Sequence, residues 1–190
     1  MNQVSAKFKE YVRGLRTRRE KFSLVKLMET FLNVMSVRLF GSGTFDLVKP
    51  YYLDVDALLS SYKLRKKSSK NPIHRKNLRK ETAKKFFSIL EQLGAIVPKW
   101  LSAIPDGLHA NEFEEWKEKT SRSEFKFLTG LVKSSAQLQF LRNNLCLIAD
   151  TVADTSANKK LRELVIKKIE TEFEDSGDNF PIGTPTIVKK

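Results

Sequence analysis

The sequence predicts a mainly α-helical fold that contains one short β-hairpin. Apolar residues recur at intervals of three and four over most of the 190-residue chain, which is the spacing of one face of an α-helix. Residues 95–113 differ, because two short hydrophobic runs flank the turn sequence Ile104-Pro-Asp-Gly107. Hydrophobic residues make up 41% of the chain and thirteen residues are Phe, so these elements are expected to share a substantial core.

Two helices are predicted in the first part of the chain. In residues 5–21, apolar side chains recur at helical spacing from Phe8 to Leu15, and the Lys and Arg residues fall largely on other faces. A second helix is expected to follow Ser23, whose hydroxyl can cap it, and to continue to about Phe40. Gly41-Ser-Gly43 then predicts a turn.

The next predicted helix is short and is followed by a long basic loop. Pro50 is expected to interrupt any helix at that point, so the helix covers about residues 55–62. Residues 61–80 hold nine Lys or Arg residues and no Asp or Glu. Because turn-forming Ser, Asn and Pro residues occur between positions 68 and 72, residues 63–76 are predicted to form an exposed loop.

A longer helix is expected to begin at Asn77 and to end at Gly94, with an apolar inward face and a basic outward face. Residues 95–101 and 108–113 are predicted to be the two strands of the hairpin. Pro98 restricts the first strand to a short or edge position.

The segment RKETAKKFFSILEQLGAIV is similar to the third helix and first wing strand of winged helix-turn-helix domains. In those domains the recognition helix ends in a leucine-glycine-hydrophobic run, and a β-hairpin wing follows. The resemblance covers about residues 23–113 and concerns the fold alone. It departs from the pattern at one point, because some fourteen residues separate Tyr62 from Asn77 where a compact domain has a much shorter turn. The resemblance implies that the helix after Asn77 lies in the major groove of DNA.

The second half of the chain is predicted to be helical. One or two helices are expected from about residue 111 to residue 153, and a last helix follows a cap at Ser156. The predicted organisation is a basic, winged-helix-like nucleic-acid-binding region at 1–110, a helical scaffold or oligomerisation region at 111–175, and an irregular tail at 176–190.

Positive charge is concentrated in one half of the chain. Residues 1–100 carry 22 Lys or Arg and 8 Asp or Glu, whereas residues 101–190 carry 13 and 14. The net charge of +13 therefore belongs to the first half, which is the asymmetry expected when one region meets a polyanion. The alternative is a basic surface that only keeps the protein soluble.

The candidate nucleic-acid contacts are Lys and Arg residues in the predicted loop, in the helix after it and near the N-terminus. The loop residues would hold phosphates with little sequence preference, since Lys acts as a point charge. The helix residues would neutralise phosphates or, for Arg, pair with guanine edges. The predicted contacts are Arg65, Lys66, Lys67, Lys70, Arg75 and Lys76 in the loop, Arg79, Lys80, Lys84 and Lys85 in the helix, and Arg16, Arg18 and Arg19 near the N-terminus.

Duplex DNA is the predicted ligand, and RNA is its close alternative. Single-strand readers stack bases on exposed aromatic side chains, but Tyr11, Phe86 and Phe87 fall at inward positions of predicted helices. A helical genome-packaging protein that assembles in many copies would have the same charge distribution. A membrane surface is not expected as a partner, because no exposed Trp, Phe or Leu is predicted beside the basic loop. Residues 111–175 are expected to contact a second copy or a protein partner.

The sequence predicts a non-enzymatic protein without cofactors. His74 and His109 do not lie within a metal-ligand spacing, and a single Cys cannot form a disulfide framework or a Cys-rich zinc site. The first residues lack the pattern of a secretory signal, and no run of about 18 apolar residues predicts a transmembrane helix. We therefore expect an intracellular location, in the cytoplasm or on the nucleoid.

Overall fold

A computed structural model describes residues 3–16, 23–36, 43–155 and 159–171. Helices contain 86% of these residues, and none of them is in a β-strand. The helices are α1 (Gln3–Arg16), α2 (Leu24–Ser36), α3 (Gly43–Ser68), α4 (Pro72–Ser102), the 3₁₀ helix η1 (Ala110–Glu112), α5 (Phe113–Thr120), α6 (Lys126–Thr129), α7 (Ser135–Thr155) and α8 (Lys159–Thr171). The prediction of a mainly α fold is therefore confirmed.

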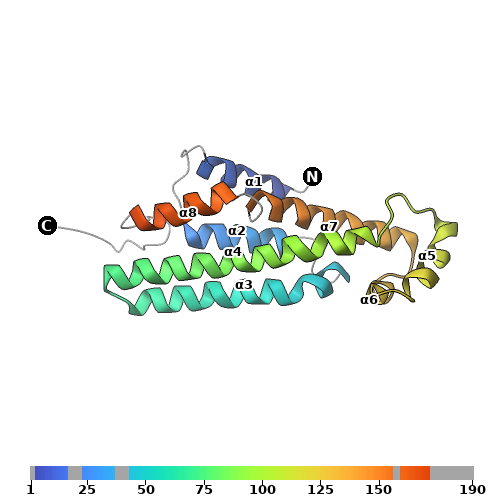
Figure 1. Cartoon of the computed structure of the whole chain (residues 1–190), viewed down its shortest axis with the longest axis horizontal. Helices are drawn as coiled ribbons and strands as arrows, with labels where there is room; N and C mark the ends of the chain where they lie inside the picture. The colour runs from blue at the N-terminus through green and yellow to red at the C-terminus, as the bar shows by residue number, and fades with distance from the viewer. Residues whose placement is uncertain (1–2, 17–22, 37–42, 156–158, 172–190) are drawn as a thin grey trace.

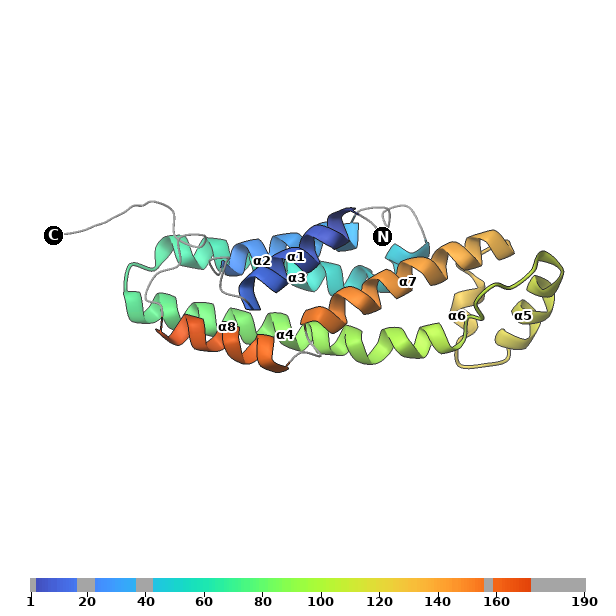
Figure 2. The same cartoon turned by 90° about the horizontal axis from the view of Figure 1, so that it is seen from above.

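The helices form an elongated bundle in which α4 is the longest element (Figure 1). α3 and α4 are antiparallel neighbours that meet at one end of the molecule. α8 lies along the first half of α4 and α7 along its second half (Figure 2). α2 packs against α3, and α1 packs on α2 and α7. η1, α5 and α6 lie at the end opposite the α3–α4 turn in both views.

One cluster of buried hydrophobic residues runs through the bundle and joins both halves of the chain. Phe86 of α4 lies at its centre, with its ring centroid 5.7 Å from that of Phe31 in α2 and 5.6 Å from that of Phe87. Leu145 of α7 and Ile169 of α8 belong to the same cluster. Removal of this apolar surface from water is the main force that holds the helices together.

The two helices predicted at the start of the chain are confirmed. Phe8 and Leu15 of α1 are buried, as their helical spacing predicts. Ser23 caps α2, because its Oγ accepts a hydrogen bond from the backbone N–H of Lys26 at 3.1 Å. Gly43 is the first residue of α3, and an added Cβ there would lie 3.0 Å from the Cβ of Leu131. Glycine at this position therefore lets the two segments approach without displacing Leu131.

The predicted β-hairpin is wrong, and with it the winged helix-turn-helix resemblance. Residues 95–101, the predicted first strand, are part of α4, which continues past Gly94 to Ser102. Residues 108–113, the predicted second strand, contain η1 and the first residue of α5. A recognition helix followed by a wing is therefore not present in the described part of the chain.

Packing against the core explains why α4 continues beyond Gly94. Val97 and Trp100 are buried and extend the inward face of Leu93 at the three-and-four spacing of a helix. Pro98 leaves one carbonyl without its usual helical partner, but it lies on the exposed face, where water can satisfy that carbonyl. Tertiary burial thus outweighs the local signals for a strand.

The predicted long basic loop is also wrong. α3 continues to Ser68 and passes through Pro50, which is exposed like Pro98, so the expected break does not occur. α4 begins at Pro72 instead of Asn77. Lys, Arg and Leu are good helix formers, so both helices extend through the basic sequence until only residues 69–71 connect them.

The last helices join the second half of the chain to the first. The side chain of Asn144 in α7 is buried, and its Nδ2 donates a hydrogen bond to Oγ1 of Thr44 in α3 at 3.2 Å. Val165 and Ile169 of α8 are buried in the common core. The predicted cap at Ser156 and the predicted tail at 176–190 lie outside the described residues.

Candidate nucleic-acid interface

The basic sequence forms the tip of the helical hairpin between α3 and α4. We call residues 63–80 the basic tip. Asn71 caps α4, because its Oδ1 accepts hydrogen bonds from the backbone N–H groups of Ile73 at 2.9 Å and His74 at 3.4 Å. Arg75 closes the turn from the other side by donating from Nε to the backbone oxygen of Ser69 at 2.7 Å. The charged residues are therefore carried by two regular helices and a short, hydrogen-bonded turn.

Most of the sequence-predicted contacts lie on the surface of this tip or just beyond it. The exposed residues are Arg65, Lys67, Lys70, Lys84 and Lys85, and the half-buried residues are Arg75, Lys76 and Lys80. These eight residues lie on the last part of α3, the turn after it and the first part of α4, and the α3–α4 turn lies at one end of the bundle (Figure 1). Arg16 lies at the end of α1 with a side chain outside the described part, and Arg18 and Arg19 lie outside it altogether.

Two predicted contacts, Lys66 and Arg79, are buried instead of exposed. Lys66 is 7% exposed, and its Nζ lies 5.9 Å from the centroid of the buried Tyr62 ring. Arg79 is 2% exposed. Arg79 is predicted on the outward face of its helix because Arg is a charged residue. It precedes the buried Ala83 by four residues and Phe86 by seven, so it lies on the inward face of α4. Neither residue is available as a surface contact.

Carboxylates from α2, α4 and α8 pair with some of the cations. The pairs are Lys63–Glu29 (3.2 Å), Arg65–Glu81 (4.0 Å), Lys85–Glu81 (3.0 Å) and Lys80–Glu170. The hydrogen bond and charge of Lys85 lower the pKa of the Glu81 carboxyl, and the charge of Arg65 adds to this effect. The sequence did not indicate the pairs with Glu29 and Glu170, because they join residues that are far apart in the chain.

Four lysines at this end have no such partner. No carboxylate in the described part of the chain lies within ion-pair distance of Lys67, Lys70, Lys76 or Lys84. Like charges on one surface repel each other, and a bound anion offsets this repulsion. The four lysines are therefore the strongest candidates for contact with an external anion.

Two exposed aliphatic residues also belong to the tip. Leu64 is 70% exposed near the end of α3, and Ile73 is 64% exposed at the start of α4. Both escaped the sequence prediction, which expected no exposed large apolar residue beside the cations. Their exposure could have been inferred once residues 63–76 were recognised as helical, because Leu64 lies opposite the inward positions Leu59, Tyr62 and Lys66.

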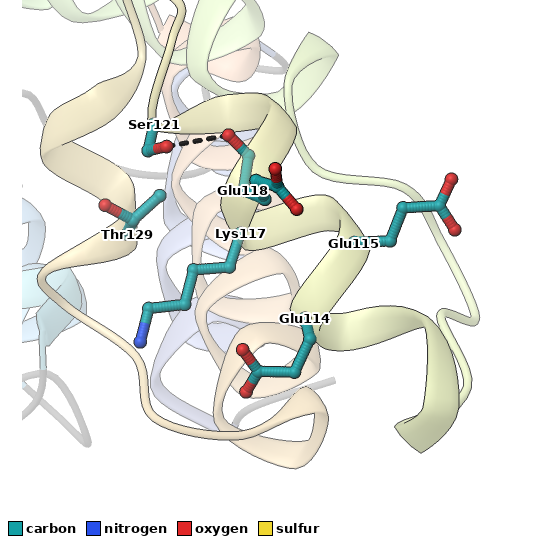
Figure 3. Close-up of a pocket in the computed structure, with 6 residues that line it drawn as sticks. All are labelled: Glu114, Glu115, Lys117, Glu118, Ser121 and Thr129. Carbon is teal, nitrogen blue, oxygen red and sulfur yellow. Dashed lines mark hydrogen bonds between the residues drawn. The ribbon is translucent and has the colours of Figure 1, made fainter.

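The opposite end of the molecule is acidic. We call residues 106–124 the acidic end, which carries six Asp or Glu and three Lys or Arg residues. A surface hollow of about 570 Å³ lies between α5 and α6 and is lined by Glu114, Glu115, Lys117, Glu118, Ser121 and Thr129. The three carboxylates point in different directions, and Glu115 points away from Lys117 and Thr129 (Figure 3). This arrangement does not converge on a common point, as an acid-base pair or a metal site would require.

A second hollow, of about 500 Å³, lies between α4 and α7 and is mainly lined by apolar residues, with Cys146 and Asp150 at its wall. His74, near the start of α4, and His109, just before η1, are both exposed. Across the described ranges, no group of three or more His, Cys, Asp or Glu side chains is placed to hold a metal ion. Among the described helices, none combines the length and the apolar character needed to span a bilayer.

Comparisons with known proteins found no matching family model, no matching curated protein and no matching solved structure.

Proposed function

We propose that this chain is a non-enzymatic protein that binds duplex nucleic acid, with duplex DNA as the preferred form, through phosphate contacts at the basic tip. The observation that carries the proposal is the accumulation, at one end of an elongated bundle, of cations that have no carboxylate partner among the described residues. Lys67 lies in the last turn of α3, Lys70 lies in the connecting turn, and Lys76 and Lys84 follow on α4. A polyanion that reaches this end meets the positive side chains before any other part of the molecule.

The chemistry of the tip favours phosphates over base edges. Base-specific contacts in duplex DNA come mainly from Arg, Asn and Gln side chains held on an element that enters the major groove. Arg79, the arginine expected to play this role, is buried, and Arg75 donates to the turn. The partner-free cations are lysines, which contact phosphates as point charges. Binding with little sequence preference is the consequence.

The burial of aromatic residues favours duplex over single-stranded ligands. Proteins that bind single strands usually provide aromatic rings on which bases stack. Tyr62, Phe86 and Phe87 are buried, and the exposed large hydrophobic residues of the tip are the aliphatic Leu64 and Ile73. The tip therefore provides charge without a stacking surface.

A matched pair of variants tests this proposal. The tip variant carries Lys67→Gln, Lys70→Gln, Lys76→Gln and Lys84→Gln. The control carries Lys117→Gln, Lys119→Gln, Lys126→Gln and Lys133→Gln, which are exposed lysines near the acidic end. Both variants lose four positive charges, so they differ only in where the charge is lost.

Binding is measured by fluorescence anisotropy with duplex DNA, duplex RNA and single-stranded DNA over about 50 to 200 mM salt. The tip variant is expected to bind duplex DNA at least about tenfold more weakly than the parent. Its slope of log K against log salt should be shallower by about 0.9 for each lost phosphate contact. The control should keep the slope of the parent.

Three outcomes would contradict the proposal. The first is a parent protein that binds none of these nucleic acids. The second is an equal loss of affinity in both variants. The third is tighter binding of the parent to vesicles of anionic phospholipid than to duplex DNA, because lysines beside Leu64 and Ile73 also suit an anionic membrane surface.

A further inference from the structure

A row of three lysines on α4 faces the end of α8. Lys76, Lys80 and Lys84 are spaced four residues apart, so they lie on one face of the helix with about 6 Å of axial rise between neighbours. We call these residues the lysine row. α8 runs along this part of α4 and ends at Thr171, close to the basic tip (Figure 2).

Glu170 of α8 lies in the field of all three lysines. Its carboxylate forms an ion pair with Lys80. The hydrogen bond from Lys80 is the main cause that lowers the pKa of Glu170, and the charges of Lys80, Lys76 and Lys84 add to it. Glu170 thus stands where an external anion would meet the charges of three lysines of α4.

We propose that the Glu170 carboxylate occupies a phosphate position on the lysine row, and that nucleic acid displaces it when it binds. This inference rests on the proposed function, because the displacing anion is the phosphate backbone. A carboxylate and a phosphate accept the same charge-assisted hydrogen bonds from Lys. Glu170 is therefore an intramolecular competitor that lowers the affinity of the tip.

The Lys80–Glu170 pair is exposed enough to be replaced. The two side chains retain 33% and 45% of their exposure, and exposed ion pairs contribute little to stability. A phosphate that arrives with its neighbours in a strand contacts several cations at once, whereas Glu170 offers one carboxylate. The exchange therefore favours the nucleic acid once other phosphates are held by Lys67 or Lys70.

The exchange does not require α8 to leave the bundle. Val165 and Ile169 are buried in the core, and Arg162 pairs with Glu91 of α4. The guanidinium of Arg162 also lies 5.9 Å from the centroid of the Phe87 ring. These contacts hold α8 on α4 whether or not Glu170 is bound to Lys80, so only the Glu170 side chain has to move.

Glu170→Gln, compared with Glu163→Gln, tests the competition. Glu163 lies seven residues earlier on the same face of α8, is exposed, and has no ion pair with a described residue. Both substitutions remove one negative charge from one helix face. Circular dichroism and thermal unfolding establish that both variants fold like the parent before binding is compared.

Glu170→Gln is expected to strengthen binding to duplex DNA on the order of threefold to fivefold at about 50 mM salt, the size of one exposed ion pair. The salt slope should steepen by up to about 0.9, since Lys80 no longer has the Glu170 carboxylate as its partner. Glu163→Gln should leave affinity and slope near those of the parent.

A double-mutant cycle with Lys80→Gln makes the test specific. If Glu170 competes at Lys80, Lys80→Gln lowers affinity more in the Glu170→Gln background than in the parent. Equal gains from Glu170→Gln and Glu163→Gln, or no coupling in the cycle, would overturn the inference while the proposed function stands. A parent that binds no nucleic acid would instead overturn the proposed function.

Discussion

The basic tip and the acidic end carry opposite charge on different kinds of scaffold. At the basic tip, α3 and α4, helices of 26 and 31 residues, carry eight of the nine cations, and the three-residue turn between them carries the ninth, Lys70. At the acidic end, six of the nine charged residues lie in η1 and α5, helices of three and eight residues, and the other three lie in the irregular segments beside them. Regular backbone hydrogen bonds within two long helices hold the basic tip, whereas individual side-chain contacts hold the acidic end.

The contacts at the acidic end are specific and local. Trp116 donates from Nε1 to the backbone oxygen of Ala103 at 2.8 Å, and Arg142 donates from Nε to that of Ile104 at 3.1 Å. Gln139 accepts a hydrogen bond from the backbone N–H of Gly107, a residue with φ of 73°. These side chains therefore satisfy backbone groups of segments that lie outside regular helices. We infer that substitutions at the acidic end mainly affect stability, whereas substitutions of exposed residues at the basic tip mainly affect binding.

The largest expected effect concerns Arg79, the more deeply buried of the two buried cations of the basic tip. Arg79→Gln should lower the free energy of unfolding by about 2–3 kcal/mol, because a buried polar side chain loses its contacts and its packing. Lys84→Gln, five residues later on the exposed surface, should change it by less than about 0.5 kcal/mol. Urea denaturation followed by circular dichroism measures both. Equal stability of the two variants would remove the distinction between structural and ligand-binding cations at this end.

A smaller effect is expected at the acidic end. Trp116→Phe removes the donor to the Ala103 carbonyl but keeps an aromatic ring beside Phe113, whose ring centroid lies 5.9 Å away. The loss of this hydrogen bond should lower the free energy of unfolding by about 1 kcal/mol. The affinity for duplex DNA should stay that of the parent under conditions where the variant is folded. A loss of affinity without a loss of stability would contradict the division between the two ends.

Helical periodicity in the sequence predicted much of the core but did not predict the ends. The stripes of α1, α2 and the middle of α4 follow from apolar spacing alone, and the cap at Ser23 follows from its place before the stripe of α2. The same periodicity, extended in both directions along α4, would have predicted burial of Arg79 and Trp100. The prediction failed at Arg79 because a cation was assumed to face water, and at Trp100 because Pro98 was assumed to end the helix. At both positions, the place of the residue on the helix determined its burial.

Other features depend on contacts that no local pattern contains. A proline inside a helix leaves the carbonyl four residues before it without a hydrogen-bond donor. Pro50 and Pro98 can lie inside α3 and α4 when that carbonyl faces water, and the packing of the whole bundle determines whether it does. The Lys80–Glu170 pair joins α4 to α8 across 90 residues of sequence. The accumulation of cations at one end was visible in the sequence, but its division into paired, buried and partner-free lysines required the structure.

The smallest expected effect is a titration at the basic tip. Because Lys80, Lys76 and Lys84 favour its charged form, the pKa of Glu170 should lie below the ordinary glutamate value of about 4.3. A carboxyl with a lowered pKa in the folded state stabilises the docked end of α8 above the ordinary pKa, and this contribution is lost as the pH falls through the lowered value. NMR titration of the side-chain carboxyl carbons measures the midpoint. In Lys80→Gln the midpoint should rise toward the ordinary value, because the main cause of the shift is gone. A midpoint that is ordinary in the parent, or unchanged in Lys80→Gln, would mean that Glu170 is not held by the lysine row, and the charged surface of the tip would then be open without competition from α8.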